Sequence, residues 1–220
     1  MNPETEKTLA FFGKMTANLT HEFKNILAII QESAGLMEDI MAISPLAQEK
    51  YQERFNKSMA TIKKQLQRGM ELATRFNRFA HAPDHTNAEM DLGETIDHFC
   101  TLTERFARLK HISLEPVSAG RQISMTTNPV LLYMALFYGL DSCLNVLPAN
   151  SEIRISLAEK NSKVAVEITC SGKDAPSGEN LFAGLKQSPS WNELEDTANQ
   201  LGAELELKTE NQGFCLAFKP

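Results

Sequence analysis

The sequence contains few of the residues that mark special classes of protein. Its 220 residues include only four cysteines, nine prolines and one tryptophan. The cysteines are Cys100, Cys143, Cys170 and Cys215, with no CxxC motif and no Cys/His pair at metal-ligand spacing. This composition argues against collagen-like, disordered and disulfide-stabilised classes. It predicts a protein of the reducing cytoplasm that has no metal site.

Long hydrophobic runs and clustered positive charge are missing too. The longest apolar run, Val130 to Leu140, is far shorter than the ~20 residues that cross a bilayer, and the polar start MNPETEKT is no signal peptide. Residues 83–220 carry 11 Lys and Arg against 19 Asp and Glu, whereas residues 1–82 carry 11 against 9. We therefore expect no membrane span and no binding to nucleic acid, which depends on clustered basic residues.

The first 82 residues have the pattern of two long helices. No proline interrupts residues 4–42, where apolar residues recur three and four positions apart. Ser44 can cap a second helix that starts with Pro45 and ends near Ala82, before Pro83. Its apolar stripe is Phe55, Met59, Ile62, Leu66, Ala73, Phe76 and Ala80. Because a lone antiparallel hairpin cannot bury both apolar faces, we predict a homodimer with a central four-helix bundle.

The rest of the chain mixes helix and strand signals, which indicates an α+β fold. Helices are expected from Asp91 to about Lys110, from Asn128–Pro129 to Leu147, and from Ser190 to about Gly202. The first and last begin with capping boxes, Asp91 with Glu94 and Ser190 with Glu193, and Asn128 caps the second, with Pro129 in its first turn. Strands are expected at residues 112–117, 121–125, 153–157, 164–168, 203–207 and 214–218. The chain thus divides into a helical hairpin, residues 1–85, and a second domain, residues 86–220.

His21 is the residue of the first helix with a chemical signature. It lies about 200° around the helix from both Leu19 and Phe23, which places it away from the core. An exposed neutral imidazole suits reversible phosphoryl acceptance. Three residues near it in the helix can assist. Asn25, on the same face, can position a water or phosphoryl oxygen, Glu22 can take the imidazole N–H, and Lys24 can offset phosphoryl charge. The other histidines, expected to be ordinary surface residues, are His81, His85, His98 and His111.

The stretch His21-Glu22-Phe23-Lys24-Asn25 resembles the phosphohistidine box of bacterial sensor histidine kinases, which reads His-Asp/Glu-hydrophobic-Lys/Arg/Asn-Asn/Thr. The proline that often follows is replaced by Ile26. The resemblance covers the whole chain, since residues 86–220 look like the α/β sandwich of the ATP-binding lobe in that family. It implies a phosphoacceptor His21, a Glu22 that assists proton transfer, and an Asn25 in the position associated with dephosphorylating a receiver.

The second domain departs from that family at the nucleotide site. The positions that match the two asparagines of the asparagine box are Tyr138 and Ser142. The adenine-binding pattern Asp-x-Gly-x-Gly is replaced by Cys170-Ser-Gly172-Lys-Asp174, which keeps only Gly172. The later glycine-rich stretch is missing. We therefore expect a degenerate lobe that binds no ATP and no other cofactor.

These features predict a phosphorelay histidine phosphotransferase, similar to those that evolved from kinases by losing nucleotide binding. His21 would take a phosphoryl group from the aspartate of one response-regulator receiver domain and pass it to another, and the receiver would bring the Mg²⁺. Three alternatives stay open. They are an active kinase core with a divergent ATP site, a pseudokinase scaffold that carries no phosphate, and a receiver phosphatase that uses Glu22 and Asn25.

Overall fold

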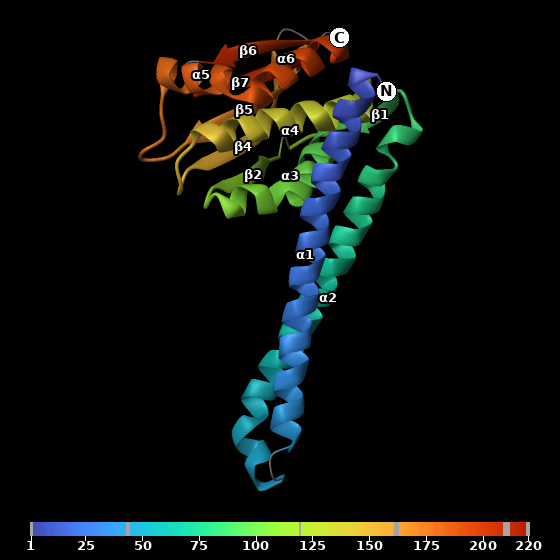
Figure 1. Cartoon of the computed structure of the whole chain (residues 1–220), viewed down its shortest axis with the longest axis vertical. Coiled ribbons are helices and arrows are strands. Elements are labelled where there is room, and N and C mark those ends of the chain that lie inside the picture. The colour runs from blue at the N-terminus through green and yellow to red at the C-terminus, as the bar shows by residue number, and fades with distance from the viewer. Residues whose placement is uncertain (1, 43–44, 119, 161–162, 209–211, 219–220) are drawn as a thin grey trace. The chain divides into compact units, whose positions relative to one another are not determined.

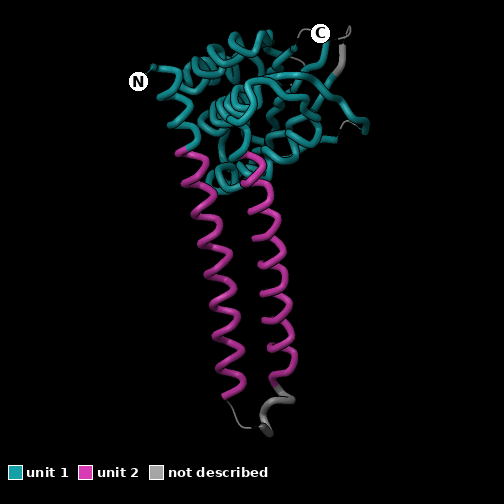
Figure 2. The backbone as a smooth tube through the Cα atoms, turned by 90° about the vertical axis from the view of Figure 1, so that its right-hand side faces the viewer, with its two compact units in different colours: residues 1–12, 80–220 teal, residues 13–79 magenta. Residues whose placement is uncertain are grey.

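The chain forms two compact units in a computed structural model (Figure 2). One unit, here called the lobe, comprises Met1–Phe12 and Ala80–Pro220, and the other, the hairpin, comprises Gly13–Phe79. The residues that the structure describes are 2–42, 45–118, 120–160, 163–208 and 212–218. Helix α1 (Pro3–Ala42) contributes its first turns to the lobe and the rest to the hairpin.

The hairpin pairs α1 with the antiparallel helix α2 (Pro45–Ala80). Its buried apolar residues are Met15, Leu19, Ile26 and Ile40 from α1 and Leu72 and Phe79 from α2. The helices approach closely at Gly69, where an added Cβ would lie 3.6 Å from Cγ2 of Ile26. Both predicted helices are confirmed, and the second ends two residues earlier than expected. The predicted cap at Ser44 lies outside the described residues.

The apolar stripe predicted for α2 is not the face that this helix buries. Leu66 is 52% exposed and Met70 is 66% exposed, whereas Leu72 and Phe79 are buried. The reason is helical phase. At 3.6 residues per turn, Leu72 and Phe79 lie roughly 100° around the helix from the centre of the predicted stripe. A single chain therefore leaves large apolar side chains of the hairpin in contact with solvent.

The lobe is an α+β domain with a mixed sheet, as predicted (Figure 1). Its helices are η1 (Ala82–Asp84), α3 (Leu92–Leu109), α4 (Pro129–Val146), α5 (Gly178–Gln187) and α6 (Pro189–Leu201). Its strands are β1 (Ala88–Asp91), β2 (Ser113–Val117), β3 (Ser124–Thr127), β4 (Glu152–Lys160), β5 (Lys163–Ser171), β6 (Ala203–Lys208) and β7 (Gly213–Phe218). The main sheet has the order β2-β4-β5-β7-β6, in which only the β2–β4 pair is parallel, and β1 pairs with β3 separately.

Two of the three N-terminal caps predicted for the lobe are confirmed. The Asp91 carboxylate accepts a 2.9 Å hydrogen bond from the N–H of Glu94, and the Asn128 amide oxygen accepts a 3.0 Å bond from the N–H of Leu131. The capping box at Ser190 is wrong, because α6 already begins at Pro189 and the Ser190 hydroxyl donates to Asp141 on α4 instead.

Three further details of the lobe differ from the sequence prediction. The strand expected at residues 121–125 covers Ser124–Thr127, and it pairs with β1, which was not predicted. Helix α5 was also not predicted. Both missed elements are short, so their local patterns are weak.

Helix α4 is the central helix of the lobe. It contacts α3, α5, α6 and β5, and its Leu132, Leu136 and Leu140 are almost fully buried. Gly139 lets the helix approach the sheet, since an added Cβ would lie 2.9 Å from Cδ1 of Ile168. Among the described helices, α4 alone is long and apolar enough to cross a membrane, but 67% of it is buried inside the lobe. Its apolar surface is thus used as the core of a domain.

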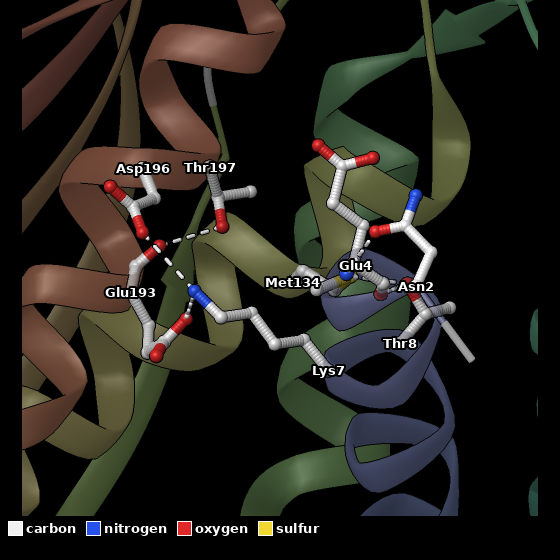
Figure 3. A network of polar contacts seen from close by, with 8 residues as sticks. All are labelled: Asn2, Glu4, Lys7, Thr8, Met134, Glu193, Asp196 and Thr197. Carbon is white, nitrogen blue, oxygen red and sulfur yellow. Dashed lines mark hydrogen bonds and ion pairs between the residues drawn. The ribbon is translucent and has the colours of Figure 1, made fainter.

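The first turns of α1 are bound to the lobe by charge and by aromatic packing. Lys7 Nζ lies 2.7 Å from Glu193 Oε2 and 3.1 Å from Asp196 Oδ2 on α6 (Figure 3). The hydrogen bonds to Glu193 and Asp196 raise the pKa of Lys7 above its usual value. One turn on, the buried Phe11 ring packs against the ring of Phe137 on α4, tilted by 56° with 5.5 Å between the ring centroids. The N-terminal segment is therefore a structural part of the lobe.

We expect Phe11→Ala to lower the free energy of unfolding of the lobe by about 3–5 kcal/mol, because it leaves a cavity beside Phe137. Urea unfolding followed by fluorescence of the buried Trp191, which lies in the lobe, measures this change. Leu9→Ala is the matched control, since Leu9 is 55% exposed and its loss should change stability by less than about 0.5 kcal/mol. Equal midpoints for the two variants would show that residues 3–12 do not contribute to the lobe.

Candidate functional site

His21 lies on the exposed surface of the hairpin, as its helical phase predicts. The side chains of Lys24 and Asn25 are exposed as well, and Asn25 lies one turn after His21 on the same face of α1. The neighbouring Leu19 and Ile26 are buried and fix the rotation of this helix. The imidazole and the Asn25 amide are therefore both accessible to a molecule that approaches this face.

Glu22 has a different environment from the other residues of the box. Only 6% of its surface is exposed, and its Oε1 accepts a 2.6 Å hydrogen bond from Nη2 of Arg68 on α2. Its carboxylate thus points into the contact between the helices. The sequence contains the signal for this burial, because Glu22 follows Leu19 by three residues and precedes Ile26 by four, on the same helical stripe.

Arg68 is the residue of this region that the sequence prediction missed. It precedes the buried Leu72 by four residues, and its side chain remains 41% exposed although its guanidinium bonds Glu22. The sequence does contain a signal for this pair, because a basic residue lies on the buried stripe of one helix and an acidic residue on that of the other. The pairing itself depends on the register between α1 and α2, which no local pattern specifies.

The lobe residues that were compared with a nucleotide motif lie in a packed region. Tyr138 is half-buried on α4, and burial raises its pKa. Ser142 is fully buried, and its hydroxyl has no hydrogen-bond partner among the described residues. Cys170 is 2% exposed at the end of β5, where its Sγ lies 3.5 Å from Sγ of Cys143. The contact with Cys170, together with burial, raises the pKa of Cys143 well above its usual value.

Gly172, the one residue of the adenine pattern that remains, has a structural role. Its φ of +153° is rare for other residues, and an added Cβ would lie 3.0 Å from Oγ and 3.1 Å from Cα of Ser151. The chain after β5 therefore needs glycine for its own backbone geometry, whether or not a ligand is bound.

Helices α5 and α6 pack against α4. Leu181 and Leu185 of α5 are completely buried, and an added Cβ at Gly184 would lie 2.8 Å from Val146 on α4. Polar contacts join the same helices. The Ser190 hydroxyl bonds Asp141, and the Asn145 amide donates to Ser188 Oγ at 3.4 Å. The side chains that follow the motif thus complete the core of the lobe.

Outside these residues, the described part of the chain has no group of side chains that could hold a metal ion. No cluster of three or more His, Cys, Asp or Glu side chains occurs there. A cleft of about 560 Å³ lies between α6 and β6, but neither Tyr138 nor Cys170 lines it. Contrary to the expectation of a surface residue, His98 is buried, with its Nδ1 2.6 Å from the hydroxyl of Tyr133.

Comparison with known proteins identifies histidine kinases as structurally similar. No protein-family model matches the chain, and no curated protein matches it. The catalytic domain of histidine kinase ThkA has a TM-score of 0.47 and 17% identity, and the match covers 60% of this chain and 94% of that one. The Acinetobacter baumannii histidine kinase AdeS has a TM-score of 0.45 and 11% identity, over 90% and 97%. Histidine kinase ThkA in complex with response regulator protein TrrA has a TM-score of 0.43 and 20% identity, over 97% and 62%.

We expect Cys170→Asp, which restores the carboxylate of the adenine pattern, to destabilise the lobe by about 3 kcal/mol at pH 7, because it buries a charge beside Cys143. Burial raises the pKa of a carboxyl group above ~3.9, so the penalty should be small at pH 4 and grow as the pH rises. Urea unfolding at both pH values measures it.

Cys170→Ser is the matched control, because it changes the polarity of the site without adding charge. Its cost should be about 1–2 kcal/mol and independent of pH. A Cys170→Asp variant that is as stable as the wild type, and gains stability from Mg²⁺ and ATP, would contradict the packed site.

Proposed function

We propose that this protein is a histidine phosphotransferase of a phosphorelay, which moves phosphoryl groups between receiver aspartates through His21 without using ATP. The observation that carries the proposal is a contrast between two sites. His21 is exposed one turn before Asn25, whereas Cys170 is buried against Cys143 at the position that matches the adenine-binding aspartate. The phosphoryl donor must then be a phosphorylated partner instead of a bound nucleotide.

The reaction needs little from the hairpin beyond an oriented nucleophile. A neutral ring nitrogen of His21 attacks the phosphorus of an aspartyl phosphate, the N–P bond forms, and the carboxylate of the receiver leaves with the electron pair of the broken P–O bond. The reverse attack by the aspartate of a second receiver restores the imidazole. Because the phosphoryl group stays in high-energy linkages throughout, no further energy source is required.

Each residue of the box has a proposed role in that exchange. Lys24, exposed three residues after His21, offsets the negative charge of the phosphoryl group. The Asn25 amide orients a phosphoryl oxygen or, in the hydrolytic side reaction, a water. Glu22, whose carboxylate accepts a hydrogen bond from Arg68 in the contact between the helices, holds the turn of α1 that carries the ring. The receiver supplies the Mg²⁺.

Exposed apolar residues of the hairpin support a homodimer. They are Leu27, Leu36, Met41, Leu66 and Met70, each between 43% and 66% exposed. Large apolar groups in this number on one helical hairpin favour association, and a second hairpin offers a matching apolar surface. The dimer would present two copies of His21.

We expect wild-type protein to acquire acid-labile label from a ³²P-labelled receiver, and none from ATP with Mg²⁺. His21→Ala should lower this label at least about 100-fold, because no other group replaces the nucleophile. His85→Ala, which removes another exposed imidazole, is the control and should behave like the wild type.

Other outcomes of this experiment identify the alternatives. Label taken from ATP would indicate an active kinase. If the labelled receiver keeps its phosphoryl group equally long with the wild type and with His21→Ala, the protein is a scaffold that carries no phosphate. Release of free phosphate with no label on the chain, abolished by Asn25→Ala, would indicate a receiver phosphatase.

We expect Leu66→Glu to convert the dimer to a monomer, because it places a charge in the apolar contact between two hairpins. Light scattering should give twice 24.5 kDa for the wild type and 24.5 kDa for the variant at micromolar concentration. Gln67→Glu adds the same charge to the neighbouring exposed residue and should remain dimeric. A wild-type mass of 24.5 kDa would contradict the four-helix bundle.

A further inference from the structure

A short polar layer interrupts the apolar contact between α1 and α2 next to His21. On α1, the polar residues Asn18 and Glu22 are only 3% and 6% exposed, because they lie on the same stripe as the buried Leu19. On α2, the layer contains Arg68, which bonds Glu22, and Gln65, whose amide oxygen is buried without a hydrogen-bond partner among the described residues. Asn18 and Glu22 bracket His21 in the sequence, so the layer and the exposed imidazole occupy the same turn of α1.

The ion pair in this layer is a costly way to join two helices. Burying a carboxylate removes its hydration, and a well-packed apolar pair of similar volume often gives at least equal stability. Glu22 is nevertheless held at 2.6 Å by Arg68, with 8% of its side chain exposed. Arginine presents several N–H donors in a rigid plane, so it fixes the position of the carboxylate that it binds. The ion pair therefore serves to orient Glu22 more than to raise the free energy of unfolding.

We propose that Arg68 is a positioning residue for phosphoryl transfer at His21 and that it acts through Glu22. This inference rests on the proposed function and assigns a further residue to it. Arg68 holds the Glu22 carboxylate in the contact between the helices, one residue from the phosphoacceptor. This bond between the two helices fixes the rotation of the turn of α1 that presents the ring of His21 to the receiver.

The kinetic test measures single-turnover transfer from a phosphorylated receiver at increasing receiver concentration. Arg68→Gln should lower the rate constant at saturation by about 10- to 100-fold and change the half-saturating concentration by less than about threefold, because the residue acts on the ring and not on receiver binding. Arg68→Lys, which keeps the charge but loses the planar donors, should recover part of the rate. The double variant Glu22→Gln/Arg68→Gln should be no slower than Glu22→Gln alone.

The control for these variants is Arg75→Gln. Arg75 also lies on α2 and forms an ion pair, but its partner Glu71 is on the same helix, at 3.1 Å. This variant should transfer at the wild-type rate. Circular dichroism at 222 nm checks that each variant keeps its helices, and Arg68→Lys tests the inference if Arg68→Gln does not fold.

A second measurement does not depend on phosphoryl transfer. The ¹⁵N resonances of the His21 ring, assigned by their loss in His21→Ala, should shift in Arg68→Gln and stay in place in Arg75→Gln. Unchanged ring resonances in Arg68→Gln would overturn the inference. So would a double variant that is slower than Glu22→Gln alone, or an Arg68→Gln variant in which only the half-saturating concentration changes. If the wild type accepts no phosphoryl group, the proposed function fails, and the ring resonances still decide whether Arg68 positions His21.

Discussion

The buried stripe of α1 is the constraint on which the candidate site depends. A helix in a hairpin must turn its apolar side chains toward its partner, and the burial of Leu19 and Ile26 fixes the rotation of the segment between them. That rotation exposes His21 and Asn25 and buries Glu22. The periodicity that folds the hairpin therefore also separates an accessible imidazole from an inaccessible carboxylate only one residue away.

In the lobe, close packing surrounds the positions that were compared with a nucleotide motif. Helix α4 contacts the sheet closely at Gly139, and α5 contacts α4 closely at Gly184, so neither contact leaves space for an extra methyl group. Cys170 and Cys143 form a buried thiol pair, and Asp141 and Asn145 on α4 bond serines at the start of α6. Polar side chains of α4 thus hold helices together. A lobe of this kind completes its core with its own side chains.

Charge pairs have different physical roles in the two units. Lys7, Glu193 and Asp196 are partly exposed, and pairs of that kind contribute little to stability but help to set where α1 begins on the lobe. The pair of Glu22 with Arg68 is different because the carboxylate is buried. Removing one partner of such a pair leaves an uncompensated charge, so a substitution of either residue should destabilise the contact between the helices. The two sites also differ in neighbours, since Phe11 supplies apolar packing beside Lys7, whereas the layer around Glu22 is polar.

Local patterns in the sequence determined the elements that depend on neighbouring residues. Helical period predicted α1, α2 and the exposure of His21, and side-chain caps predicted the starts of α3 at Asp91 and of α4 at Asn128. The same reasoning failed at Ser190, because a hydroxyl that bonds a residue 49 positions away has the same local pattern as a cap.

The tertiary structure alone decided which residues meet across elements. It placed Arg68 against Glu22, turned Leu72 instead of Leu66 into the hairpin, and brought Cys143 against Cys170. It also gave Gly172 a role in backbone geometry. The physical reason is that a helix or strand can be recognised from contacts between residues close in sequence, whereas the register and rotation of one element against another are set by packing over the whole interface.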